Sequence, residues 1–319
     1  MKRILCIVVF TCIFIQSLFA NEIDTSKIQV NSEGFLLDGM LLKNSRYNEK
    51  VPVIIFLVGS GGNSSYTTNY KDFTKFFFEE TFLKNGFALV YFDKRGVGKS
   101  QGSWYKTSFE NRATDSKNVA LAIQQFDFVD QEKIYVIGHS QGGWIAQVAI
   151  ASYPEIFAGG ISMAGPTFGV KKQLVNDYQS KYICKRGLGE NKAFIKATKK
   201  VKRDLLFISL FGIKGNWKQL KVIKNFEAAP YLEQINKPFL MLLGENDALV
   251  NVNWCMKELN SIFSGGLPSN LEIYEAKGET HSFKTAGKCY DKKEKTFYSV
   301  QTRIHLFSWI NSQKNISAL

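Results

Sequence analysis

Short apolar runs recur along the chain after residue 50, and segments with helical periodicity separate them. Continuous apolar runs are typical of strands that are buried on both faces of a sheet. They predict strands at 51–58, 87–93, 133–138, 158–164, 238–244 and 271–276, with helices at 70–83, 109–126, 142–152, about 253–263 and about 295–311. A strand pair at 27–31 and 35–43 precedes this alternation. The pattern predicts an α/β fold, with a mostly parallel central sheet and helices on both faces.

The alternation breaks between residues 166 and 230, where we expect a helical insertion. This segment is rich in aromatic residues and carries fifteen Lys or Arg against four Asp or Glu, a net charge of +11 out of +13 for the chain. Such a charge fits a solvated helical face as well as it fits attraction to anionic substrates or a membrane surface. No nucleic-acid partner is expected, because the basic stretch resembles none of the usual binding motifs.

The first twenty residues have the pattern of a secretory signal peptide. Lys2 and Arg3 precede an apolar run from residue 4 to residue 19, and Ala20 offers a small residue for cleavage. An uncleaved membrane anchor is the alternative, but the run is short for a span and contains polar residues. We therefore expect an exported protein, periplasmic or secreted. Residues 21–319 would form one domain, with the helical insertion at about 166–230.

The cysteines beyond the leader are odd in number, so at least one stays free or pairs with another chain. They are Cys184, Cys255 and Cys289. An oxidising compartment would permit one internal bridge, and Cys255–Cys289 is the pair we consider. Because no CxxC pair or cluster of His and Cys is present in the sequence, we expect neither a zinc site nor another metal or cofactor.

Residues 138–142, Gly-His-Ser-Gln-Gly, match the G-x-S-x-G pattern that places a serine on a sharp turn between a strand and a helix. A β-rich run precedes the pattern and a helix-compatible run follows it, so Ser140 is the candidate nucleophile. A glycine-rich turn with an inert serine is the alternative. The amide of Gln141 is expected to be one oxyanion donor. The amide of Ser60, in the glycine-rich loop at 59–62, is expected to be the second.

A serine hydroxyl needs a base, and the base needs an acid to orient it. His281 follows the last predicted strand in a loop, which is where parallel-sheet enzymes place catalytic groups. Of the other two histidines, His139 lies beside the nucleophile, so that its ring should point away, and His305 lies among apolar residues of a predicted helix. Asp247 is the expected acid, because it follows the strand before that loop. Glu245 and Asp93 are fallback acids, although Asp93 precedes the serine in the chain.

Five segments resemble the successive signatures of the α/β-hydrolase superfamily and occur in its order: VIIFLVGSGG, YFDKRGVGKS, IGHSQGGWIAQ, GENDALV and THSF. They are most similar to serine-aminopeptidase-like and dienelactone-hydrolase-like bacterial esterases. The resemblance implies a catalytic triad of Ser140, Asp247 and His281. It also implies that the loop at 93–100 braces the site and that the insertion is a cap over it. Val58 departs from the pattern, because many relatives have a histidine before the oxyanion glycine.

Three functions remain open. A serine hydrolase that cleaves carboxylic esters through an acyl-enzyme is favoured, with a small-molecule ester, anionic or lipid-like, as its substrate. A serine aminopeptidase or amidase would hold a substrate ammonium with acidic groups, which are few in the insertion. A catalytically silent domain that acts as a binding module is disfavoured by the complete set of candidate residues. Peripheral contact with a membrane through the basic insertion is a further expectation.

Overall fold

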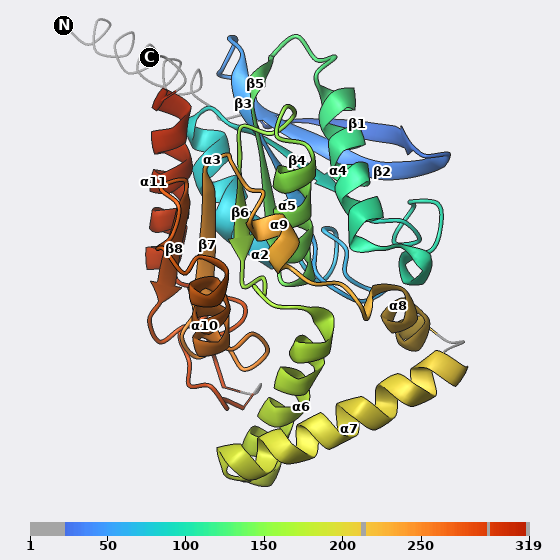
Figure 1. Ribbon diagram of the computed structural model, residues 1–319. Helices are drawn as coiled ribbons and strands as arrows, with labels where there is room; N and C mark the ends of the chain where they lie inside the picture. Colours follow the sequence, from blue (N-terminus) through green and yellow to red (C-terminus); the bar gives the residue numbers. More distant parts are fainter. Residues whose placement is uncertain (1–22, 212–214, 292–293, 317–319) are drawn as a thin grey trace, which may run out of the picture.

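The computed structural model describes residues 23–211, 215–291 and 294–316, so the expected signal peptide lies outside the described residues. One eight-stranded sheet forms the centre, in the order β1-β2-β4-β3-β5-β6-β7-β8 (Figure 1). Its strands are β1 (Ile23–Ser32), β2 (Phe35–Asn44), β3 (Val51–Leu57), β4 (Ala88–Phe92), β5 (Val129–His139), β6 (Gly159–Met163), β7 (Phe239–Gly244) and β8 (Leu271–Ala276). The pairs β1–β2 and β2–β4 are antiparallel and all other pairs are parallel, which confirms the predicted sheet.

Apolar side chains on the two faces of the sheet form two separate cores. Along β3, Val53 and Ile55 pack into one core, while Ile54 and Phe56 pack into the other, as the alternation of side chains along a strand requires. The first core is completed by α4 (Phe109–Ile123) and α5 (Gln141–Ser152). The second is completed by α11 (Val300–Ile316) and by a helical segment rich in phenylalanine. Every residue of β3 is buried, which is why its sequence is apolar throughout.

The segment predicted as one helix at 70–83 is divided in the structure. It consists of α2 (Lys71–Thr74), a π-helical turn η2 (Lys75–Glu79), α3 (Glu80–Phe82) and a 3-10 turn η3 (Leu83–Asn85). Phenylalanine side chains from these turns are buried against the sheet: Phe73, Phe77, Phe78 and Phe82. Helical periodicity alone predicts no π turn, because the wider turn depends on how the rings pack in the core.

Between β6 and β7 the chain leaves the sheet and forms α6 (Val170–Arg186), α7 (Glu190–Phe211), α8 (Gly215–Ile223) and α9 (Ala229–Leu232). Helices α6 and α7 pack against each other, and α8 lies at the far end of α7 (Figure 1). We call α6–α8 the cap. It follows the carboxyl end of β6 and so lies beyond the edge of the sheet at which parallel-sheet enzymes place their sites. None of the helices in the described part of the chain is both long and apolar enough to cross a bilayer.

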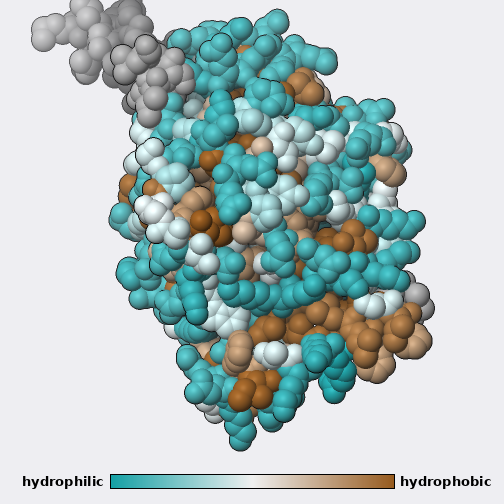
Figure 2. All heavy atoms as spheres, in the orientation of Figure 1, coloured by the Kyte–Doolittle hydropathy of each residue, from teal (hydrophilic) through white to brown (hydrophobic). Residues whose placement is uncertain are grey.

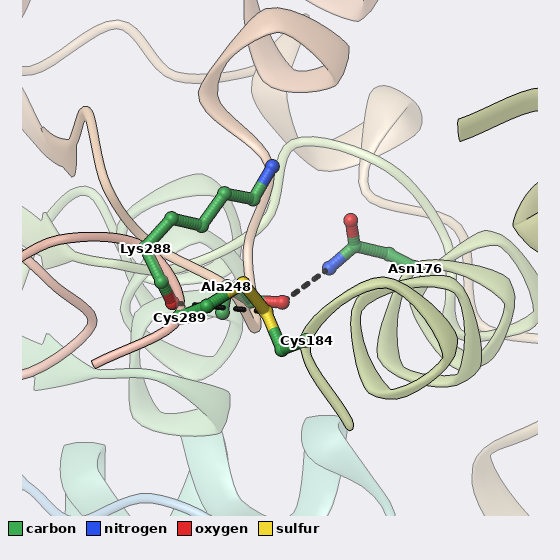
Figure 3. Close-up of a disulfide and its surroundings, with 5 residues drawn as sticks. All are labelled: Asn176, Cys184, Ala248, Lys288 and Cys289. Atoms are coloured by element: carbon green, nitrogen blue, oxygen red, sulfur yellow. Dashed lines mark hydrogen bonds between the residues drawn. A yellow bond between two sulfur atoms is a disulfide. The ribbon is translucent and has the colours of Figure 1, made fainter. Parts of the chain in front are cut away.

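A disulfide joins the cap to the loop that follows β8 (Figure 3). Cys184 of α6 bonds Cys289, with 5.1 Å between their Cα atoms. The pairing of Cys255 with Cys289 is therefore wrong. Cys255 lies in α10 (Val252–Ile262), where it is a buried free thiol whose pKa burial raises to about 12. The sequence could not choose the partner, because the pairing depends on how the cap folds back toward that loop.

Candidate active site

Ser140 stands on a strained turn between β5 and α5. Its φ of 58° and ψ of −121° are rare for a residue with a side chain and cost about 1–3 kcal/mol. The turn closes only because glycines flank it. A Cβ on Gly138 would lie 1.8 Å from the carbonyl oxygen of Gly142, and a Cβ on Gly142 would lie 2.1 Å from that of Leu57. Both motif glycines are thus required by close backbone approach.

A cavity of about 320 Å³ lies between Ser140 and the cap. Four of the five predicted site residues line it, namely Ser60, Ser140, Gln141 and His281. Cap side chains form its other wall, among them Asp177, Gln219 and Leu220. The amide of Gln141 belongs to the first turn of α5, where backbone N–H groups have no acceptor within the helix. The candidate nucleophile, base and oxyanion donors therefore share one cavity.

Asp247 lies behind His281 and orients its ring. The Nδ1 of His281 is 2.7 Å from the Oδ2 of Asp247, which leaves Nε2 for proton exchange. The Oδ1 of Asp247 accepts the amides of Leu249 and Val250 at 2.7 and 2.9 Å, and the side chain is buried. Burial of the His281 ring lowers its pKa, but the charge of Asp247 and the hydrogen bond outweigh this, so that the pKa is raised.

The fallback acid Glu245 lies elsewhere. Its Oε2 accepts the amide of Gly278 at 2.7 Å, and its Oε1 lies 3.6 Å from the ammonium of Lys277. These contacts hold the carboxylate at the surface of the β8 loop. Asp247, rather than Glu245, is the acid that contacts the imidazole.

Two buried cations fix the orientation of the loop that contains Ser60. The ammonium of Lys94 donates to the carbonyl of Gly59 at 2.6 Å, and the guanidinium of Arg112 donates to the carbonyl of Val58 at 2.7 Å. In a trans peptide the C=O and N–H groups point in opposite directions, so the amide of Ser60 faces away from Lys94. Burial lowers the pKa of both cations, that of Arg112 to about 10.

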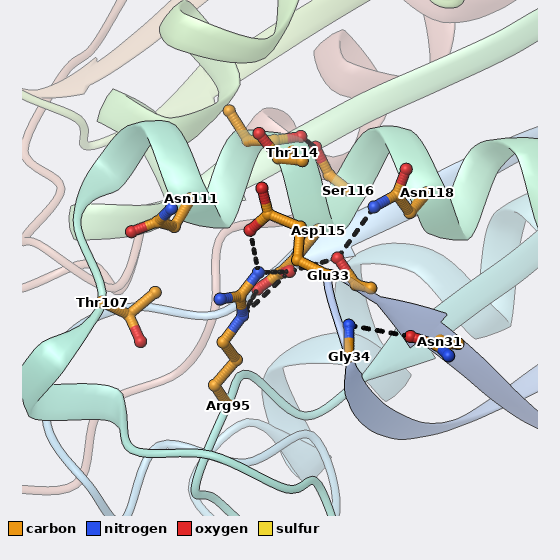
Figure 4. A network of polar contacts seen from close by, with 12 residues as sticks. Asn31, Glu33, Gly34, Arg95, Thr107, Asn111, Thr114, Asp115, Ser116 and Asn118 are labelled. Atoms are coloured by element: carbon orange, nitrogen blue, oxygen red, sulfur yellow. Dashed lines mark hydrogen bonds and ion pairs between the residues drawn. The ribbon is translucent and has the colours of Figure 1, made fainter.

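The loop at 93–100 is held in place by an ionic network (Figure 4). Arg95 contacts Asp115 of α4 at 2.6 Å and Glu33 of the β1–β2 turn at 2.7 Å. Ser32 also donates to Asp115, at 2.6 Å. These contacts fix the chain next to Lys94 and thereby support the loop above it.

His139 joins the Ser60 loop to the His281 loop. Its Nδ1 lies 2.8 Å from the hydroxyl of Tyr70, which accepts the amide of Gly59 at 3.0 Å. Its Nε2 lies 2.8 Å from the carbonyl of His281. Because a carbonyl only accepts, the proton of His139 is assigned to Nε2. Burial, followed by the nearby His281, lowers the pKa of His139 to about 3, so the ring is neutral.

His305 lies outside the cavity. Its ring stacks on Tyr274 with 4.0 Å between the ring centroids, and it lies 3.4 Å from Glu272 on β8. Packing of α11 against the sheet accounts for its position. Across residues 23–211, 215–291 and 294–316, no cluster of His, Cys, Asp or Glu side chains is arranged to hold a metal ion.

Asp177 is a site residue that the sequence did not single out. It projects from α6 into the cavity, and the side-chain Nε2 of Gln173 donates to its Oδ1 at 2.9 Å. Burial raises the pKa of its carboxyl to about 6, although Lys181 and Gln173 favour the charged form. Its charge contributes to the raised pKa of His281. The only signal in the sequence is that Asp177 is one of four acidic residues in the insertion.

Known proteins share both the sequence pattern and the fold. The family described as "Serine aminopeptidase, S33" matches residues 55–262. Dipeptidyl peptidase 8 of Mus musculus is 26% identical over 147 residues, which cover 44% of this chain and only 16% of that protein. The bifunctional esterase/perhydrolase of Acinetobacter calcoaceticus is 24% identical over 227 residues, 64% of this chain and 78% of that protein.

A solved structure gives the same result for the fold. Est1E of Butyrivibrio proteoclasticus, with ferulic acid bound, superposes with a TM-score of 0.56 at 18% identity and covers 91% of this chain and 98% of its own. The fold, the order of the motifs and the extent of the family match agree. This chain is an α/β-hydrolase that belongs to the serine aminopeptidase S33 family.

Proposed function

We propose that this protein is a serine hydrolase that cleaves carboxylic esters through an acyl-enzyme. One observation carries the proposal. Ser140, on its strained turn, shares a cavity with His281, whose Nδ1 is bonded to the buried Asp247. Acyl transfer by serine needs this set of groups, with a nucleophile, a base and an acid that fixes the tautomer of the base.

In the proposed reaction, His281 Nε2 takes the proton of Ser140 as Oγ bonds to the ester carbonyl carbon. The amides of Gln141 and Ser60 donate to the oxyanion, and losing one such donor costs about 2.7–4 kcal/mol in the barrier. The intermediate then collapses, and His281 gives the proton to the departing alcohol. Water attacks the acyl-enzyme with His281 again as base, and the carboxylic acid leaves as Ser140 recovers its proton.

An ester substrate is favoured by the lining of the cavity. Apolar side chains surround the region next to Ser140, among them Trp144, Val170, Leu174 and Ile223. Such a lining accepts an apolar acyl group. The bifunctional esterase/perhydrolase of Acinetobacter calcoaceticus, which this chain resembles, carries esterase activity by its name.

A serine aminopeptidase is the second candidate, and Asp177 is the observation that favours it. The small number of acidic residues in the insertion argued against an ammonium substrate, but one of these carboxylates lines the cavity. The family name and the likeness to dipeptidyl peptidase 8 point in the same direction. The ester remains preferred, because several side chains next to Ser140 are apolar and burial raises the pKa of Asp177, which disfavours the charged form that an ammonium would require.

Two measurements test the proposal. A fluorophosphonate probe should label the wild-type protein at Ser140 and leave Ser140→Ala unlabelled. A folded wild type that resists the probe would favour a silent binding module. Hydrolysis of p-nitrophenyl esters should exceed that of aminoacyl-p-nitroanilides. Faster anilide hydrolysis, with a KM for the anilide that rises in Asp177→Asn while the KM for the ester stays the same, would establish the aminopeptidase instead.

We also propose that the protein is exported to the periplasm or secreted. The signal-peptide pattern of residues 1–20 supports this, as does the Cys184–Cys289 bond, since disulfides persist in oxidising compartments. Cell fractionation with mass spectrometry should find a mature chain that begins at Asn21 outside the cytoplasm. Full-length protein that is retained in the cytoplasm would contradict export.

A further inference from the structure

Large apolar side chains are exposed at the far end of the cap, where α7 and α8 meet (Figure 2). We call this group the apolar tip; it comprises Leu206, Phe207, Leu210, Phe211, Trp217 and Val222. Leu206 is 62% exposed, Leu210 66% and Phe211 60%. Monomeric proteins rarely leave several neighbouring large apolar side chains exposed, and such a patch usually marks a surface that binds a protein, a membrane or a ligand.

Helix α7 changes character along its length. Its buried side chains, Ala193, Ala197, Val201 and Ile208, lie on one face, as expected of a helix packed on one side. From Leu205 to Phe211, however, the only polar residue is Ser209. A helical segment that is apolar on all sides is normally buried. In this segment only Ile208 is buried, and Leu206, Phe207, Leu210 and Phe211 are exposed.

Positive charge flanks the apolar tip along the chain. The sequence from Glu190 to Lys224 carries ten Lys or Arg against two acidic residues, and Lys202, Arg203, Lys218 and Lys221 are close to the tip residues in sequence. One of these two, Asp204, already contacts Lys200 at 2.8 Å and Tyr178 at 2.7 Å. This charge is complementary to an anionic surface. A second copy of the chain on the tip would bring like charges together.

We propose that the apolar tip docks this protein on an anionic lipid bilayer. Apolar side chains of the tip enter the boundary between headgroups and acyl chains, and lysines around it contact the lipid phosphates. Gln219, Leu220 and Ile223 of α8 line the cavity, whereas Trp217 and Val222 of the same helix are exposed. Docking therefore places the wall of the cavity at the lipid surface. The proposal does not depend on the reaction at Ser140.

The test is cosedimentation with vesicles of phosphatidylcholine, with and without phosphatidylglycerol. The chain is used from Asn21 onward, because both cores lie within residues 23–316 and the apolar leader would bind lipid by itself. Binding should require phosphatidylglycerol and weaken as salt is added. Equal binding to both kinds of vesicle would overturn the proposal.

Variants separate the two contributions. Leu210→Ser with Phe211→Ser should abolish binding, and Lys202→Gln, Arg203→Gln and Lys221→Gln should each reduce the affinity roughly fivefold. Leu121→Ser with Ile304→Ser is the matched control, since these side chains are 42% and 52% exposed outside the cap. It should bind like the wild type. Circular dichroism and thermal midpoints check that every variant is folded.

Trp217 reports contact with lipid directly. Its emission should shift to shorter wavelength when anionic vesicles are added, and Trp217→Phe, which keeps the other four tryptophans, should lose that shift. Wild-type binding by tip variants would overturn the proposal. So would light scattering that shows a dimer of the wild type and a monomer of the Leu210→Ser, Phe211→Ser variant, because a second copy would then cover the tip.

Discussion

The sheet and the cap of this protein are built differently. Every residue of β3, β4, β6 and β7 is buried, and the buried cations beneath the Ser60 loop each donate to a backbone carbonyl. In α7, by contrast, four of 22 residues are buried. The sheet thus fixes its attached groups within narrow limits, whereas most side chains of α7 are not buried. This difference suggests that the sheet determines the chemistry and that the cap determines what reaches it.

The two regions meet at the loop that contains Asp247. Gln173 and Asn176 of α6 both donate to the carbonyl of Leu249, and the disulfide holds the end of α6 against the loop after β8. The cap therefore contacts the loops that position Asp247 and His281. Variants of the two regions should differ in the size and kind of their effects.

The largest effect is expected at the acid in the sheet region. Asp247→Asn should reduce kcat by roughly 10⁴-fold, because an amide no longer holds His281 in the reactive tautomer. Glu245→Gln, two residues away, should retain almost full activity. Steady-state kinetics on a p-nitrophenyl ester measures both. Similar losses in the two variants would mean that the His281–Asp247 contact is not what matters.

The next largest effect is expected when the disulfide between the cap and the loop after β8 is removed. Cys184→Ser with Cys289→Ser removes a bond between residues 105 positions apart and should lower the free energy of unfolding by about 2–5 kcal/mol. Denaturant titration measures this change. A reductant should lower the stability of the wild type to that of the variant and leave the variant unchanged. A wild type that is insensitive to reductant would rule out the bond.

Removing a side chain that supports the Ser60 loop should have a smaller effect on kcat than the change at Asp247. Lys94→Met removes the donor to the Gly59 carbonyl and should lower kcat roughly 10²-fold with little change in KM, because the Ser60 amide is needed most in the transition state. Lys99→Met is the control, because Lys99 is exposed and lies in the loop at 93–100 that also contains Lys94. A rise in KM at constant kcat would show that Lys94 affects binding instead.

The smallest effect is expected at the acid in the cap. Asp177→Asn removes a charge that raises the pKa of His281, so the acidic limb of the kcat/KM profile should move to lower pH. Asp204→Asn, whose carboxylate binds Lys200 on α7, should leave the profile unchanged. A shift to higher pH in Asp177→Asn would contradict the assigned sign.

Stability should also respond to Asp177. Its pKa is raised from 3.8 to about 6 in the folded protein, so the fold favours the protonated form. The contribution of Asp177 to the free energy of unfolding therefore falls as the pH rises from 3.8 to about 6. Relative to the wild type, Asp177→Asn should be more stable above pH 6 than below pH 3.8, as measured by thermal denaturation.

Local patterns were sufficient for much of this protein. The apolar runs predicted all six strands after residue 50, and the glycines at 138 and 142 predicted the sharp turn at Ser140. His281 followed from its position after a strand, whereas Asp247 rested mainly on the resemblance to the α/β-hydrolases. These features depend on a few neighbouring residues, on side-chain periodicity or on the carboxyl edge of a parallel sheet. All three can be predicted from the order of residues in the sequence.

Tertiary structure decided the rest. The partner of Cys289, the side of α6 on which Asp177 lies, and the placement of Lys94 and Arg112 beneath the Ser60 loop all depend on contacts between segments distant in sequence. The exposure of the apolar tip also depends on such contacts, because Leu206 and Phe211 are residue types that usually lie in a core. A sequence states which side chains are apolar or charged, but only the packing of helices decides what each side chain faces.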